Sequence, residues 1–169
     1  RKYFAKPLKN ELMHEVALRI LIRKCQLIGA QYDKSLVPIY GHATLHYDRV
    51  FFMVIKGRQK VDTLIKNHKY FLYCDKCMNR RVSEFNNEIC ECGNKFVYSG
   101  PIWVGKIWNE DLAKSMINGE AMIDLIAEES KIDVVGFFDL HKIAKKYIVK
   151  IPKMELIFDA LRKDGYKVS

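Results

Sequence analysis

Long apolar runs and secretion signals are missing from this sequence. No stretch of about 18 consecutive apolar residues occurs, which excludes a transmembrane helix and leaves no reason to expect a membrane partner. The charged start lacks the apolar core of a secretory signal peptide, and no Asn-X-Ser/Thr glycosylation acceptor is present. We therefore expect a cytoplasmic location, with a nuclear or organellar one left open for a eukaryotic source.

Common catalytic motifs are missing as well. Neither Gly-X-Gly-X-X-Gly nor Gly-X-Ser-X-Gly occurs, and these mark dinucleotide-binding folds and α/β-hydrolases. His14-Glu15 does not extend to the His-Glu-X-X-His motif of zinc proteases, because position 18 is Leu18. No Ser/His/Asp arrangement stands out. The residues themselves therefore predict no catalytic residue in this chain.

Acidic residues are fewer than basic ones. The chain of 169 residues has 29 Lys and Arg against 20 Asp and Glu, a net charge of +9, and the excess lies in residues 1–100. A hydrophobic content of 49% is normal for a globular protein of one large domain or roughly two to three small ones. The positive charge makes nucleic acid or anionic lipid the first partner to consider, with solvated surface lysines as the alternative.

Cysteine is scarce, yet four of the five cysteines form two close pairs. The pairs are Cys74-Asp-Lys-Cys77 and Cys90-Glu-Cys92-Gly93, with twelve residues between them. Tight turns at both pairs would direct the sulfurs to one tetrahedral zinc site with four cysteine ligands, and four protein ligands make such a site structural. Free or oxidised cysteines and a redox role are the alternatives, and the spacing favours Zn²⁺.

Apolar periodicity predicts a long helix followed by an antiparallel hairpin. The helix is expected over residues 10–30, with Asn10 as N-cap and one apolar stripe of Met13, Val16, Ala17, Ile20, Leu21, Leu27 and Ile28. The strands are expected at residues 36–40 and 47–55. A short helix around residues 61–65 and short strands at 70–73, 82–85 and 96–98 follow, and Gly100-Pro101 indicates a boundary.

The last third of the sequence reads as helical. Helices are expected at residues 109–118 and 120–129, with Asn109 as the first N-cap. Asp139 is expected to cap a third helix with Leu140, Ile143, Ala144 and Tyr147 on one face. Pro152 would begin a fourth, with Met154, Ile157, Phe158 and Leu161 facing inward, Gly165 at its end and a strand at 166–168. Helix, turn, helix and strand is the order of a winged helix.

Basic residues gather at two places that suit RNA. Residues 141–153 contain five lysines and no acid, and a helix-turn-helix carrying them would face phosphates. Arg80 and Arg81 lie on the cysteine loop, and Lys69 precedes the aromatic pair Tyr70-Phe71. A solvated charged face and the core of a small domain are the competing interpretations.

Several blocks of the sequence together resemble the tRNA guanine-26 N2-dimethyltransferases. They occur in the family's order and span nearly the whole chain: residues 1–3, 9–21, 46–50, 73–93, 100–105 and 164–166. In that family an N-terminal class I methyltransferase domain binds S-adenosylmethionine and carries an Asp-Pro-Phe-Gly motif. Neither is present here, and the chain begins at Arg1 without an initiator methionine, so we expect a fragment that lacks the N-terminal cofactor-binding half and is inactive alone.

The resemblance implies an α/β (α+β) chain of three parts. Residues 1–57 would supply the last helix and closing hairpin of the methyltransferase sheet. Residues 58–100 would form a zinc-binding, zinc-ribbon-like module, and residues 101–169 a helical, winged-helix-like domain. Together they would support the fold and the tRNA binding of an enzyme that dimethylates N2 of guanine 26.

The resemblance also implies tRNA rather than DNA as partner, and no catalytic residue is carried over. Arg1, Lys2 and Tyr3 would wall the base pocket. The full set of RNA-binding candidates is Arg1, Lys2, Tyr3, Arg49, Arg80, Arg81, Lys142, Lys145, Lys146, Lys150 and Lys153. The alternatives are a stand-alone zinc-ribbon and winged-helix accessory factor that binds nucleic acid, and a zinc-stabilised protein-interaction module.

Overall fold

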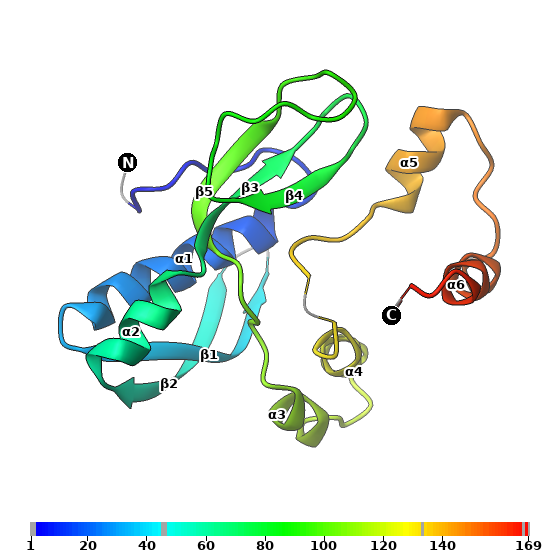
Figure 1. Cartoon of the computed structure of the whole chain (residues 1–169). Coiled ribbons are helices and arrows are strands. Elements are labelled where there is room, and N and C mark those ends of the chain that lie inside the picture. The colour runs from blue at the N-terminus through cyan, green and yellow to red at the C-terminus, as the bar shows by residue number, and fades with distance from the viewer. Residues whose placement is uncertain (1–2, 45–46, 133, 167, 169) are drawn as a thin grey trace.

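The computed structural model describes residues 3–44, 47–132, 134–166 and 168. They form a mixed α/β structure in which one long helix lies against two small sheets and shorter helices follow (Figure 1). The elements in chain order are α1 (Met13–Ala30), β1 (Lys34–Ala43), β2 (Asp48–Lys56), α2 (Arg58–Ile65), β3 (His68–Tyr73), β4 (Arg80–Ser83), β5 (Val97–Trp103), α3 (Glu110–Ser115), α4 (Ala121–Glu129), α5 (Leu140–Tyr147) and α6 (Met154–Lys163).

Strands β1 and β2 form an antiparallel hairpin beside α1, as predicted. The pairing runs from Lys34 opposite Lys56 to Ala43 opposite Asp48, so β1 is longer than expected and β2 begins and ends one residue later than expected. Gly29 allows the helix to approach β1 closely, because a Cβ there would lie 2.8 Å from the carbonyl oxygen of Lys34. The predicted order of long helix and hairpin is therefore confirmed.

The second sheet has the strand order β4-β3-β5, with antiparallel pairing throughout. Its core joins α1 and the preceding segment to the strands, through buried Leu12, Val16, Ile20, Phe71 and Ile102. A second cluster lies on the hairpin side of α1 and contains Leu18, Ile22, Leu64, Trp103 and Ile107. Helix α1 is thus shared by the two sheets.

Sharing between two sheets explains why the predicted stripe of α1 is partly wrong. Met13, Ala17 and Ile28 are exposed, whereas Leu18 and Ile22 are buried. Apolar residues surround much of this helix, so periodicity alone selects no single buried face. The helix also buries the polar side chain of Gln26, next to β1.

Asn10 is not the N-cap of α1. The helix begins at Met13 with Leu12 in the cap position and no side-chain cap. The Oδ1 atom of Asn10 instead accepts a hydrogen bond from the N–H of Leu12 at 3.0 Å. Asn side chains often close such local turns, which compete with helix capping.

The N-terminal segment is joined to β5 by backbone pairing. Lys6 and Gly100 exchange two N–H···O bonds of 2.8 Å, and the hydroxyl of Ser99 donates to the carbonyl of Lys6 at 2.6 Å. Strand β5 runs through Gly100 and Pro101 to Trp103, so this dipeptide lies inside a strand. The division into residues 1–57, 58–100 and 101–169 stays a prediction.

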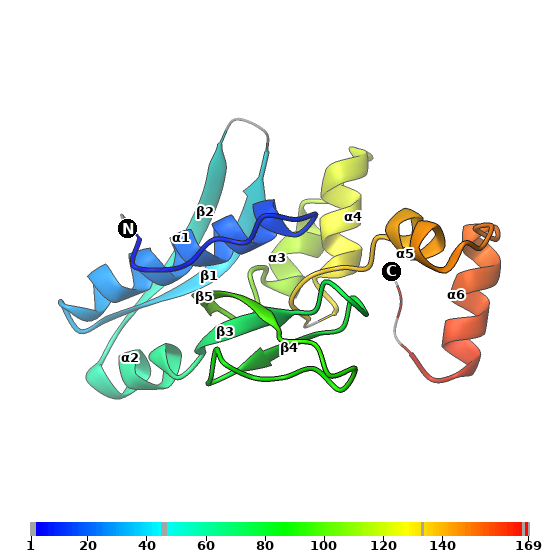
Figure 2. The same cartoon turned by 90° about the horizontal axis from the view of Figure 1, so that it is seen from above.

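The C-terminal helices follow the predicted order. The side chains of Asn109 and Asp139 cap α3 and α5, and Gly165 adopts a φ of 84° just after α6, all as predicted. Helices α3 and α4 pack against Tyr40 of the hairpin. Helices α5 and α6 lie at one end of the molecule, on the side away from the hairpin (Figure 2).

Helix α6 buries less than predicted. No residue of α6 is buried, and Met154, which was expected to face inward, is 51% exposed. Tyr166 and Val168 form no strand, while Lys167 between them lies outside the described residues. Among the described residues the predicted strand after α6 is therefore not found.

A buried arginine ties together segments that are far apart in the sequence. Arg19 of α1 donates to Glu15 at 2.8 Å, to the carbonyls of Trp103 and Gly105 at 3.1 and 2.9 Å, and to that of Val134 at 3.3 Å. Its side chain is 4% exposed. A buried guanidinium is tolerated when its donors are satisfied in this way. Within the part of the chain that the structure describes, no helix is long and apolar enough to cross a membrane.

Candidate metal centre and nucleic-acid interface

The structure brings the four predicted cysteine ligands together at one end of the β3–β4 hairpin. Their Sγ atoms all lie within 4.8 Å of one another, with Cys74 and Cys92 at 3.5 Å and Cys77 and Cys90 at 3.3 Å. Disulfide sulfurs lie about 2.05 Å apart, so the four thiols are free. Tetrahedral Zn–S bonds of about 2.3 Å place sulfurs roughly 3.8 Å apart, which this cluster fits.

Local backbone geometry directs the sulfurs inward. After β3 the chain turns at Cys74, whose carbonyl accepts from the N–H of Met78 at 2.7 Å, and Met78 adopts a φ of 63°. In the second turn Gly93, with a φ of 80°, donates to the carbonyl of Cys90 at 2.8 Å. That φ suits glycine, which has no Cβ to clash. The two turns therefore hold two cysteine pairs face to face.

Crowding changes the acidity of these thiols. Burial raises the pKa of Cys74, but hydrogen bonds from the backbone and thiol of Cys77 outweigh it and lower the pKa to about 6. A backbone hydrogen bond from Asn79 lowers the pKa of Cys77, but hydrogen bonding with Cys90 and the other sulfurs raises it to about 12. One thiolate forms easily and a second is opposed by the first. A divalent cation is the partner that would allow all four to ionise.

Two asparagines near the sulfurs were not identified from the sequence. The side-chain amide of Asn94 lies 3.7 Å from the Sγ of Cys74, and that of Asn79 lies 3.9 Å from the Sγ of Cys90. Amide donors stabilise thiolates and orient metal ligands. Asn79 lies two residues after Cys77, and Asn94 lies two residues after Cys92. Their closeness to the cysteines in the sequence is the only signal that could have identified them.

The predicted lysines of residues 141–153 divide into two groups. Lys142 and Lys146 contact the β3–β4 sheet and its cysteine turn. Lys145, Lys150 and Lys153 are exposed and make no ion pair within the described part of the chain. Two of the five lysines are therefore engaged in contacts with the sheet and its cysteine turn.

The other predicted RNA contacts are scattered. Arg80 is half-buried against the ring of Phe138, and Arg81 forms an ion pair with Glu88. Arg49 is exposed at the start of β2, over the ring of Tyr47. Arg1 and Lys2 lie outside the described residues.

Tyr3 lies at an apolar groove beside α1. The groove has a volume of about 500 Å³, and its lining comprises Tyr3, Ala5, Pro7, Ala17, Ile20, Leu21 and Asp48. Tyr3 is 39% exposed. Of the three residues predicted to line the base pocket, Tyr3 is the one that the structure describes, and it lines this groove.

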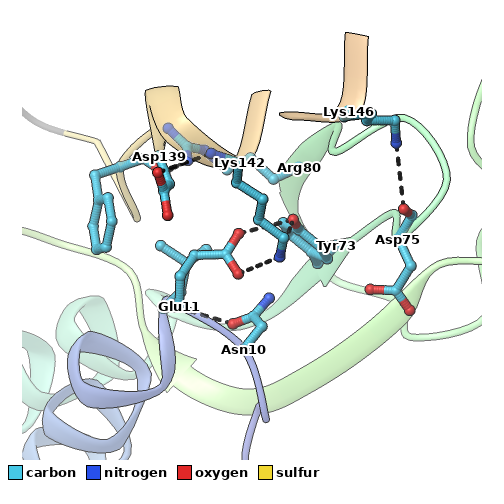
Figure 3. A network of polar contacts seen from close by, with 10 residues as sticks. Asn10, Glu11, Tyr73, Asp75, Arg80, Asp139, Lys142 and Lys146 are labelled. Atoms are coloured by element: carbon cyan, nitrogen blue, oxygen red, sulfur yellow. Dashed lines mark hydrogen bonds and ion pairs between the residues drawn. The ribbon is translucent and has the colours of Figure 1, made fainter. Parts of the chain in front are cut away.

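A polar network was also not predicted from the sequence (Figure 3). It lies beside the cysteine module, by which we mean β3, β4, β5 and the two turns that carry the cysteines. The Nζ of Lys142 donates to Glu11 at 2.5 Å, and the hydroxyl of Tyr73 donates to the other oxygen of Glu11 at 2.9 Å. Burial raises the pKa of Glu11, but these hydrogen bonds outweigh it and lower the pKa. The same carboxylate raises the pKa of Lys142. Contacts between residues so distant in sequence leave no local pattern.

Comparison with known proteins assigns the family. The model of the N2,N2-dimethylguanosine tRNA methyltransferase family matches residues 1–169. The chain belongs to this family. A family member from Aquifex aeolicus, a tRNA (guanine(26)-N(2)/guanine(27)-N(2))-dimethyltransferase, is 40% identical over 167 residues, which cover 90% of this chain and 42% of the relative.

Two further family members extend the comparison. The tRNA (guanine(26)-N(2))-dimethyltransferase of Methanobrevibacter smithii is 36% identical, over 99% of this chain and 47% of its own length. The structure of Trm1 from Pyrococcus horikoshii with S-adenosyl-L-methionine matches with a TM-score of 0.76 and 28% identity, over 99% of this chain and 46% of that one. The chain thus spans about half the length of the N2,N2-dimethylguanosine tRNA methyltransferases it matches.

Proposed function

We propose that this chain is part of an S-adenosylmethionine-dependent tRNA methyltransferase that dimethylates N2 of guanine 26. The observation that carries the proposal is the match of all 169 residues to one tRNA methyltransferase family. Relatives from two distant organisms are named for dimethylation at guanine 26. Because the chain spans 42% and 47% of these relatives, the activity is proposed for a longer polypeptide.

The chemistry defines what this chain would contribute. N2 of guanine is a poor nucleophile because its lone pair is delocalised into the ring, and the base must leave the stack to be reached. S-adenosylmethionine supplies the methyl group when it is bound by the preceding half. The described residues would hold the tRNA and, near Tyr3, wall the space for the base. No catalytic residue is assigned to this chain.

The preceding half would cover exposed apolar residues on α1 and on the face of β2 that does not pack against α1. Met13 and Ile28 of α1, and Phe51 and Met53 of β2, are 47–52% exposed. Large apolar side chains exposed on regular elements are typical of surfaces that another part of a protein covers. β2 pairs with β1 alone among the described strands, which leaves one edge open for a further strand.

Zinc is the proposed occupant of the cysteine cluster. Cys74, Cys77, Cys90 and Cys92 would hold one Zn²⁺ with no open coordination position, so the ion would be structural. The turn geometry and the mutual S···S distances support this assignment. The β3–β4–β5 module would then be zinc-ribbon-like.

Replacing one ligand tests the zinc proposal. Cys77→Ser should abolish zinc binding and unfold the module, whereas Cys25→Ser, at a half-buried thiol outside the cluster, should leave one zinc per chain. Metal content is measured by elemental mass spectrometry and protection of β3 and β4 by amide exchange. Retained zinc and unchanged protection in Cys77→Ser would reject the site.

Residues 101–169 would serve as the RNA-holding helical part, which keeps the helix order of a winged helix without its strand among the described residues. The order of α3 to α6 and the lysines after Asp139 support this assignment. A tRNA substrate also supports a cytoplasmic location.

Activity measurements test the whole proposal. The natural full-length protein, with S-adenosylmethionine and unmodified tRNA, should produce N2,N2-dimethylguanosine, which mass spectrometry of digested tRNA detects. A tRNA with adenine at position 26 is the matched control and should remain unmethylated at that position. The 169-residue chain alone should bind tRNA in a salt-dependent manner without methylating it. Absence of the modified nucleoside with the full-length protein would overturn the proposal.

A further inference from the structure

Helix α5 is held against the cysteine module by its own lysines. The ammonium group of Lys142 lies 2.5 Å from the carboxylate of Glu11 and 3.4 Å from the hydroxyl of Tyr73 (Figure 3). The Glu11 side chain is only 16% exposed, and Tyr73 is buried. A carboxylate this close repels phosphate, so Lys142 is poorly placed to bind the RNA backbone.

A second lysine and an arginine complete the attachment. Lys146, four residues after Lys142 and thus on the same side of α5, donates to the carbonyls of Asp75 and Lys76 in the first cysteine turn. The guanidinium of Arg80 stacks on the ring of Phe138, 3.7 Å from its centroid, just before α5. The predicted RNA-binding cations Lys142, Lys146 and Arg80 are thus engaged in contacts with other residues of the chain.

The remaining lysines of the segment have no such partners among the described residues. Lys145, Lys150 and Lys153 are exposed, and residues 141–153 contain no acid. Uncompensated cations on one segment are the groups that release counterions when they meet phosphates.

We infer that the basic segment is divided by function: Lys142 and Lys146 are positioning residues that dock α5 on the cysteine module, and Lys145, Lys150 and Lys153 contact tRNA phosphates. The inference rests on the proposed tRNA-binding function and specifies which cations carry it. Docking of α5 fixes the position of Lys145, which is on the same helix, and the point from which the segment with Lys150 and Lys153 starts.

The test compares matched substitutions in the natural full-length protein. One variant is Lys142→Gln, and the other replaces Lys145, Lys150 and Lys153 by Gln. Affinity for unmodified tRNA is measured across a salt series, and protection of α5 is measured by amide exchange. The triple variant should lower the slope of log affinity against log salt by roughly two, since each lost phosphate contact contributes about 0.7 to 0.9, with α5 protection unchanged.

Lys142→Gln should give the opposite pattern. Exchange in α5 should rise, and affinity should fall by roughly fivefold, about the effect of one partly exposed ion pair, with the salt slope unchanged. The charge-swapped pair Glu11→Lys with Lys142→Glu should restore both protection and affinity, whereas Glu11→Lys alone should not. A salt slope that falls in Lys142→Gln and stays low in the swapped pair would make Lys142 a phosphate contact and overturn the division.

Two other outcomes also test the division of the lysines. An unchanged slope in the triple variant would reject the three outer lysines as phosphate contacts. If the unaltered protein binds no tRNA at any salt concentration, the proposed function and the phosphate role fail together. The exchange measurements on Lys142→Gln and the swapped pair still report the docking role in that case.

Discussion

The imidazole of His68, at the start of β3, is held in one tautomer. The side-chain amide nitrogen of Gln26 donates to the carbonyl of Leu36 at 3.1 Å, so the amide oxygen faces His68. That oxygen lies 2.8 Å from the Nε2 atom of His68, which must therefore carry the proton. Burial, with a further contribution from the charge of Arg23, lowers the pKa of His68 to about 4.

Stability should therefore fall in mild acid. The unfolded chain protonates His68 near pH 6.5, whereas the folded chain resists protonation until about pH 4. The contribution of His68 is complete above pH 6.5 and is lost as the pH falls through this window, by on the order of 2 kcal/mol after allowance for partial exposure. Denaturant unfolding at several pH values measures it. His68→Gln should show a shallower decline, and identical declines would contradict the assignment.

Two arginines about one turn apart on α1 differ in whether their guanidinium groups have hydrogen-bond acceptors. Arg19 has acceptors on Glu15 and on backbone carbonyls, whereas two side-chain nitrogens of Arg23, Nε and Nη1, are buried without a partner among the described residues. Burial lowers the pKa of Arg23. The first residue joins elements, and the second carries an uncompensated desolvation cost.

The two arginines should respond differently to the same substitution. Arg19→Met should lower the free energy of unfolding by about 3 kcal/mol, because it leaves Glu15 and buried carbonyls without donors. Arg23→Met should change it by less than about 1 kcal/mol, or raise it, since a poorly satisfied group is replaced by an apolar one. Chemical denaturation of both variants measures the difference, and equal losses would show that the contacts of Arg19 are not what matters.

Local signals predicted the elements well. Asn109 and Asp139 each cap a helix through a side chain that reaches three residues along, so neighbouring sequence contains the information. The cysteine cluster is similar, because two short turns bring each pair together. The contacts of Arg19 with Trp103 and of Glu11 with Lys142 join residues 84 and 131 positions apart, and no spacing rule reports them. The buried face of α1 was misjudged because two sheets compete for it.

Large apolar side chains are exposed on two elements of the molecule. Phe51 and Met53 on β2 are 52% and 50% exposed, and Met13 on α1 is 48% exposed. Large contiguous apolar patches on soluble chains promote association. Under the proposed function, the preceding half of the polypeptide would cover these residues.

The 169-residue chain should therefore self-associate when produced alone. Replacing Phe51 and Met53 by Thr, which keeps β propensity, should shift it toward the monomer in sedimentation velocity without changing its circular dichroism. The matched control, Phe85→Thr, alters an exposed aromatic residue away from β2 and should leave association unchanged. In the full-length protein the same double substitution should lower stability, because it removes apolar contacts from a covered surface.

The contacts of Arg19 also bear on how the chain is made. Its acceptors on Trp103, Gly105 and Val134 lie 84, 86 and 115 residues further along the chain. During synthesis α1 leaves the ribosome before these acceptors do, and it carries the Arg19 cation on a face that the folded protein buries. At about 5 to 20 residues per second, those acceptors follow several seconds later. During that interval water solvates Arg19. We therefore expect α1 to complete its packing only after the chain as far as Val134 has been translated.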